Sequence, residues 1–247
     1  MKIIGITQAR IGSSRLPRKV LLEIEGKTLL QYHLERAIQS KMVDKWFVAT
    51  TQEPESDLIC NIASNLSVQN YKGSLNDVLD RFYQIAKDEK PDYIVRITSD
   101  CPLIDSVLID KVVQFTINEN VDFASNTFIE DFPDGQDVEV MRFSALEQAW
   151  KNANKPYQKE HVTPYIREHS SLMGGDIFIS ANFPSPGKYE KIRLTVDEKK
   201  DFEVISILIH DLGAEKGWLE YADYYENNEE IHELNSSIKR NEGYRKV

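Results

Sequence analysis

Residues 2–19 have the sequence KIIGITQARIGSSRLPRK, in which a short apolar run gives way to a polar loop. The run from Lys2 to Gln8 predicts a buried strand, because short apolar stretches bounded by polar loops are typical of parallel sheets. A helical pattern follows, and it begins with Thr28 and Gln31 at the spacing of a capping box. The order of strand, long loop and helix is the start of a βαβ unit, and its repetition along the chain decides the fold class.

Short apolar runs and amphipathic stretches continue to alternate over the next hundred residues. Further strands are predicted at Trp46–Thr50, Val68–Tyr71 and Tyr93–Thr98, each followed by a helical pattern. Strands joined by helices of this length predict a mainly parallel, doubly wound α/β sheet flanked by helices. In such sheets the ligand binds at the carboxyl ends of the strands.

The pattern changes in the middle of the chain. Two strands are predicted at 122–126 and 137–143, with a turn-rich stretch between them, and Ser144 with Glu147 predicts the cap of another helix. We interpret approximately residues 126–190 as a small β-rich excursion over the site, which would bind the acceptor and form the dimer interface.

The remaining third contains one more strand, one more long helix and an acidic end. The strand is predicted at 192–196 and the helix at 202–212. From approximately 215 to 247 we expect a peripheral acidic helical tail. Because no linker or repeat interrupts the chain, residues 1–247 are interpreted as a single domain.

Composition excludes several classes of protein. The formal net charge of −10 disfavours nucleic acid and anionic membranes as partners, because both call for a positive face. No run approaches the ~18 apolar residues of a membrane-spanning helix. Cys60 and Cys101 lack metal-ligand spacing, so we expect two reduced cysteines in a cytoplasmic protein.

The loop after the first predicted strand is basic, although the protein is acidic. There is no Asp or Glu between Met1 and Leu22. The loop contains the cations Arg10, Arg15, Arg18 and Lys19 and the small residues Gly12, Ser13 and Ser14. This composition at a strand end suits a polyphosphate, although a solvated basic loop would have it too. The loop lacks GxxxxGK[ST] and GxGxxG, so it predicts neither a Walker-type site nor a dinucleotide site.

Gln8-Ala9-Arg10 and the segment 14–19 resemble the signature loop of the cytidylyltransferases that make CMP-activated sugars. These include CMP-Kdo synthetases, acylneuraminate cytidylyltransferases and the spore coat polysaccharide biosynthesis branch. Later segments are similar to that last branch, in the expected order: 73–74, 77–81, 96–105, 133–140, 160–166 and 194–197. The resemblance covers nearly the whole chain up to about residue 210.

The resemblance implies a Rossmann-like nucleotide-diphospho-sugar-transferase fold, CTP as nucleotide substrate, Mg²⁺ as cofactor and a homodimer. It implies transfer of CMP to a sugar or sugar-acid acceptor with release of pyrophosphate. Arg10 and Lys19 would contact the triphosphate, and Asp100 and Asp197 match the metal-binding aspartates of the family. The implied nucleotide contacts are Gln8, Ala9, Arg10, Gly12, Ser13, Ser14, Arg15, Lys19, Gly73, Ser74, Asp77 and Arg81. The implied acceptor contacts are Asn126, Asp137, Glu139 and His161.

Several of these residues also have a structural interpretation. Asp100 could stabilise a turn and Asp197 could cap a helix, while Asp201 is a weaker metal candidate and better explained as a surface or first-turn acid. Arg81 could reach the base or pair with a neighbouring carboxylate. Arg96 lies on a strand predicted to be buried, so it needs a charge partner there.

Differences from related families narrow the expected acceptor and the expected nucleotide. The form Ser14-Arg15-Leu16-Pro17 is closer to CMP-Kdo and spore coat enzymes than to acylneuraminate enzymes. Ala9-Arg10 stands where uridylyl-, guanylyl- and thymidylyltransferases generally show Gly-Gly, which favours cytidine. Two other classes remain as alternatives. A glycosyltransferase would typically show a DxD motif where this chain has Ser99-Asp100-Cys101-Pro102, and a non-catalytic nucleotide-binding module is the second alternative.

Overall fold

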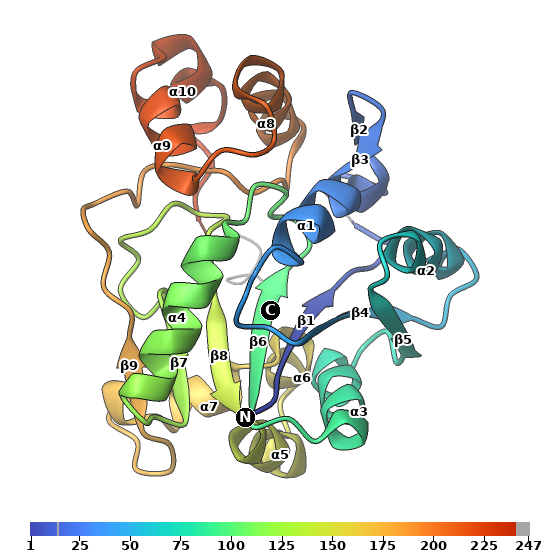
Figure 1. Cartoon of the computed structure of the whole chain (residues 1–247), viewed down its shortest axis with the longest axis vertical. Coiled ribbons are helices and arrows are strands. Elements are labelled where there is room, and N and C mark those ends of the chain that lie inside the picture. Colours follow the sequence, from blue (N-terminus) through green and yellow to red (C-terminus); the bar gives the residue numbers. More distant parts are fainter. Residues whose placement is uncertain (14, 241–247) are drawn as a thin grey trace.

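A seven-stranded sheet with the order β5-β4-β1-β6-β8-β7-β9 forms the centre of the computed structural model (Figure 1). The structure describes residues 1–13 and 15–240. The strands are β1 Ile3–Gln8, β4 Lys45–Thr51, β5 Gln69–Gly73, β6 Tyr93–Thr98, β7 Phe123–Ser125, β8 Glu139–Arg142 and β9 Ser180–Asn182. Strands β5, β4, β1 and β6 are mutually parallel, β8 is antiparallel to both its neighbours, and β9 is parallel to β7. The predicted mainly parallel α/β sheet is confirmed.

Helices cover both faces of this sheet (Figure 1). They are α1 Leu29–Ala37, α2 Ser56–Asn65, α3 Val78–Glu89, α4 Ser106–Asn118, α5 Phe143–Asn152, α6 Pro156–His161, α7 Pro164–Glu168, α8 Lys199–Leu212, α9 Trp218–Glu226 and α10 Glu229–Asn235. Helices α1, α2, α4, α8 and α9 pack on one face, and α3, α5 and α7 on the other. A hairpin of β2 Glu23–Ile24 and β3 Lys27–Thr28 precedes α1, and the 3-10 turns are η1 Lys19–Leu21 and η2 Ser171–Met173.

The period-two alternation of β1 divides the apolar core between the two faces. Ile3 packs with the first group of helices, and Ile4 and Ile6 pack with the second. Burying an aliphatic side chain of this size contributes about 1.5–3 kcal/mol. A Cβ at Gly5 would lie 2.2 Å from the ring of Trp46, so only glycine lets that ring cross β1.

Two local predictions are wrong. Residues 192–196 form no strand and make only an isolated bridge between Asp134 and Arg193. The apolar side chains of Leu194 and Val196 in this segment are nevertheless fully buried. Helix α5 begins at Phe143 with Arg142 at its N-cap, so Ser144 does not cap it. Strand β8 ends at Arg142 and runs directly into the helix, where the Phe143 N–H donates to the Asp92 carbonyl at 3.2 Å.

The region 126–190 and the described part of the acidic tail both pack against the rest of the protein. Strands β8 and β9 extend the central sheet, and the rest of the region is largely helices α5, α6 and α7. In the described part of the tail, Tyr221 and Tyr225 are fully buried, so α9 packs against the main body with one face. No helix in residues 1–13 and 15–240 is long and apolar enough to span a membrane.

Candidate active site

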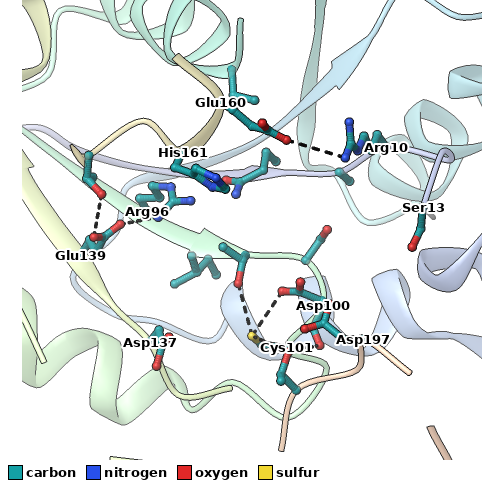
Figure 2. A pocket seen from close by; sticks show the side chains of 18 of the residues that line it. Arg10, Ser13, Arg96, Asp100, Cys101, Asp137, Glu139, Glu160, His161 and Asp197 are labelled. Carbon is teal, nitrogen blue, oxygen red and sulfur yellow. Dashed lines mark hydrogen bonds and ion pairs between the residues drawn. The ribbon is translucent and has the colours of Figure 1, made fainter. Parts of the chain in front are cut away.

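A cleft of about 770 Å³ lies at the carboxyl ends of β1 and β6 (Figure 2). Parallel strands direct their following loops to one edge of the sheet, which brings residues 8–13 and 15–19 together with residues 98–101 there. Segments after β5, around β8, α6 and α7, and before α8 complete the walls. Charged and polar side chains dominate this lining.

Two carboxylates and one lysine form the centre of the cleft. The Lys19 ammonium donates hydrogen bonds to Asp100 at 3.0 Å and to Asp197 at 2.8 Å, and Arg15 lies 2.9 Å from Asp197. Burial raises the pKa of Asp100, but Lys19 and a hydrogen bond from Thr98 outweigh it and hold that pKa well below its ordinary value. The two carboxylates in turn raise the pKa of Lys19 above its ordinary value against the effect of burial.

Asp100 and Asp197 offer hard oxygen ligands of the kind that a divalent cation takes, and the Lys19 ammonium lies between them in this structure. Mg²⁺ prefers hard oxygen ligands, keeps several waters and usually takes only one or two carboxylates together with substrate phosphates. Among the described residues, no group of three or more His, Cys, Asp or Glu side chains is placed to hold a metal ion. A cation held by these two carboxylates alone would have to complete its coordination with phosphate oxygens and water.

Asp201 stabilises the loop that carries Asp197 through hydrogen bonds. This fully buried carboxylate accepts hydrogen bonds from the backbone N–H groups of Asp197 and Glu198, both at 3.0 Å. It also accepts from Arg193 at 2.8 Å. Asp201 is the expected acid in the first turn of α8, but it is buried and supports the site instead of facing solvent.

Most of the predicted nucleotide contacts line one half of the cleft. Gln8, Ala9, Arg10, Gly12, Ser13, Arg15, Lys19 and Arg81 are in its walls. Ser14 lies outside the described residues. The Gln8 side-chain oxygen is buried and has no hydrogen-bond partner among the described residues, so it can accept from a ligand. Across the cleft, Arg10 lies 3.9 Å from Glu160 (Figure 2).

Arg81 reaches this half of the cleft because Gly73 makes room for it. A Cβ at Gly73 would lie 2.6 Å from Cγ of Arg81, whose side chain is almost completely buried. The guanidinium donates to the Ala49 carbonyl at 2.9 Å. Burial, followed by the nearby charge of Arg10, lowers the pKa of Arg81 to about 10, so it stays cationic at neutral pH.

Three predicted nucleotide contacts are not in the cleft walls. Gly73 packs against Arg81, and the Ser74 hydroxyl accepts from the Asn76 N–H at 3.3 Å. Asp77 caps α3 by accepting from the Asp80 N–H at 2.9 Å. Leu75 and Val78 of the same segment line the cleft in their place.

A buried ion cluster forms the floor of the other half. Arg96 pairs with Glu139 of β8, which is the charge partner that its buried position requires. Glu139 also accepts from the Thr163 hydroxyl at 2.8 Å and lies 3.5 Å from Arg167. His161 lines the cleft, and burial lowers its pKa, so the imidazole is neutral near pH 7.

Asn126 and Asp137, both predicted to contact the acceptor, differ in their positions. The fully buried Asn126 donates to the Gln136 carbonyl at 2.7 Å and accepts from the Val138 N–H at 2.9 Å. Both ends of its amide thus bond within the loop between β7 and β8, and Asn126 is not among the residues that line the cleft, so its contact with the acceptor stays a prediction. Asp137 lines the cleft (Figure 2).

A family model described as cytidylyltransferase matches residues 4–241. The chain belongs to the cytidylyltransferase family. This cytidylyltransferase is 42% identical over its whole length to an uncharacterized protein of Methanocaldococcus jannaschii, 99% of which is covered. It is 33% identical to the spore coat polysaccharide biosynthesis protein SpsF of Bacillus subtilis, over 85% of this chain and 88% of the relative. A solved cytidylyltransferase from Leptospira borgpetersenii superposes with a TM-score of 0.89 at 33% identity, covering 97% of this chain and all of that one.

The cytidylyltransferase also has site residues that the sequence did not point to. Arg240 from the acidic tail lies in the cleft wall and donates to Asp137 at 2.6 Å. Arg167 lines the cleft as well. The acidic composition of the tail predicted a surface element. No local pattern indicates that Arg240 bonds a residue 103 positions earlier in the chain.

Proposed function

We propose that this cytidylyltransferase transfers CMP from CTP to a sugar or sugar-acid acceptor and releases pyrophosphate. The observation that carries the proposal is the convergence of Lys19, Asp100 and Asp197 beside the basic first loop at the sheet edge. The name of the B. subtilis relative, a spore coat polysaccharide biosynthesis protein, supports a role in making surface polysaccharide or another glycoconjugate.

In this reaction an acceptor oxygen attacks the α-phosphorus, and the bond to the β-phosphate oxygen breaks as pyrophosphate leaves. Catalysis rests on positioning and on neutralising charge on the phosphates. Arg10, Arg15 and Lys19 face the half of the cleft where those charges would lie. Asp100 and Asp197 would hold Mg²⁺, which neutralises phosphate oxygens when it is bound.

The two halves of the cleft differ in a way that suits two substrates. The half around Arg10, Arg15 and Lys19 is rich in cations, as a triphosphate requires. The half around Asp137 and Glu139 combines carboxylates with arginines, and such mixed polar surfaces bind hydroxylated ligands through directional hydrogen bonds. We assign CTP to the first half and the acceptor to the second.

A turnover assay tests the proposal. The purified protein is incubated with Mg²⁺, each of the four nucleoside triphosphates, and a panel of keto-sugar acids and sugar or polyol phosphates. We expect pyrophosphate with CTP, a CMP adduct by mass, and loss of both in Asp100→Asn. Transfer from a supplied nucleotide sugar would instead identify a glycosyltransferase. CTP binding without turnover across the panel would favour a binding module.

A further inference from the structure

The acidic tail is fastened to the loop that carries Asp197. We call residues 229–240, which comprise α10 and Arg240, the C-terminal arm. Its fully buried Asn235 donates to Asp201 at 3.0 Å and to the Arg193 carbonyl at 3.2 Å. The Tyr225 hydroxyl donates to Asn235 at 2.7 Å. A buried amide with all these bonds satisfied fixes the arm in one position.

Arg240 extends from this arm into the cleft wall. Its side chain is 11% exposed, and one guanidinium nitrogen donates to Asp137 at 2.6 Å. A second nitrogen donates to the Phe132 carbonyl at 2.9 Å. Because the guanidinium is planar, these two bonds fix its orientation and that of the Asp137 carboxylate together.

Without Arg240, Asp137 would lie among carboxylates. Burial is the largest cause that raises the pKa of Asp137, and Glu139 at the start of β8, Asp100 after β6 and Glu130 of its own loop raise it further. Arg240 is the cation that opposes them. Burial and the charge of Asp137 also raise the pKa of Asp134 on the same loop, to about 7.

We propose that Arg240 is a positioning residue for the acceptor half, and that it holds Asp137 as an ionised carboxylate turned toward the hydroxyl groups of the acceptor. This inference rests on the proposed function. Direct capture of an anion by Arg240 is disfavoured, because Asp137 is bonded to it and Asp134 lies 4.0 Å away. A carboxylate that lines the cleft and is held from behind is suited to accept hydrogen bonds from hydroxyls.

The kinetic test compares Arg240→Met, Arg240→Lys and the matched control Lys239→Met, since Lys239 is the exposed neighbour on the same arm. The acceptor is the compound of the panel that turns over fastest. For Arg240→Met we expect kcat/KM for the acceptor to fall about 100-fold, while the Kd for CTP with Mg²⁺ stays within about twofold. Because only the ionised carboxylate is competent, the acid limb of the pH profile should move to higher pH. Arg240→Lys should recover part of both losses.

A carbon-13 titration of the aspartate carboxyl groups provides a readout that needs no turnover, with Asp137→Asn used to assign the resonance. The Asp137 midpoint should rise in Arg240→Met and stay unchanged in Lys239→Met. If wild type transfers CMP to no acceptor, the proposed function fails while this titration still tests the arm. An unchanged midpoint would overturn the inference. A parallel loss of CTP binding and thermal stability in both Arg240 variants would also overturn it, because the role would then be structural.

Discussion

The two halves of the cleft are assembled in different ways. The nucleotide half takes most of its charged residues from one loop, residues 8–19, and from the end of the adjacent strand β6. The acceptor half takes its charged residues from other segments, such as Asp137 of the loop before β8 and Arg240 of the C-terminal arm. A site made from loops at parallel strand ends follows from topology, whereas the place of Arg240 depends on how the C-terminal arm packs. We expect changes in the nucleotide half to affect turnover most, and changes in the acceptor half to affect stability most.

The largest effect is expected from Asp197→Asn in the nucleotide half. The change removes the charge on which Lys19 and Arg15 converge at 2.8 and 2.9 Å. We expect turnover to fall about 10³-fold with the fold retained, because this group acts on charge in the transition state. Steady-state pyrophosphate release and circular dichroism measure the two outcomes. Asp88→Asn, on the exposed side of α3, is the control, and activity above a tenth of wild type in Asp197→Asn would contradict the assignment.

In the acceptor half, Arg96→Met should lower stability more than any change in the first loop. It leaves the Glu139 carboxylate, whose side chain is 8% exposed, without its principal cation. Breaking one side of a buried ion pair costs about 3–5 kcal/mol, which urea unfolding would show. The double variant Arg96→Met with Glu139→Gln should be less destabilised than the sum of the two single changes. Strict additivity would show that the pair does not support this half.

A smaller effect is expected on the pH dependence of the free energy of unfolding, through His33. This residue links β1 to the segment after β6 in the nucleotide half. Its ring bonds the Cys101 carbonyl at 2.9 Å and the Thr7 hydroxyl at 3.0 Å. Burial lowers the pKa of His33 to about 4, below the roughly 6.5 of an unfolded chain. The unfolded state therefore binds the extra proton, and stability should fall by about 3 kcal/mol as pH drops from about 6.5 to about 4.

Urea unfolding at a series of pH values checks this dependence. The difference between wild type and His33→Gln isolates the His33 contribution from groups such as Asp134. His210→Gln is the matched control, because that side chain is 77% exposed and should leave the pH dependence unchanged. A wild-type slope that persists in His33→Gln would place the titrating group elsewhere.

The same contrast explains what the sequence could predict. Strand alternation and the polar residues that follow β1 and β6 are local signals, so the sheet and the places of Lys19 and Asp100 could be predicted. The burial of Asn126 could not, because the motif does not show that both ends of its amide bond within its own loop. Arg240 was missed because the residue before it, Lys239, is solvent-exposed and its partner is distant in the sequence.

The smallest effect concerns the cation site itself. The Lys19 ammonium lies between Asp100 and Asp197, where a divalent cation would have to bind. Removing it in Lys19→Met should raise the affinity for Mn²⁺ in the absence of nucleotide about tenfold, comparable to one charge-assisted hydrogen bond, and should weaken CTP binding. Electron paramagnetic resonance of Mn²⁺ measures the first change, and calorimetry the second. Arg18→Met is the control, because Arg18 pairs at the surface with Glu55. If Lys19→Met binds Mn²⁺ no better, the lysine and the cation use different sides of the two carboxylates, and Lys19 does not have to move before the cation binds.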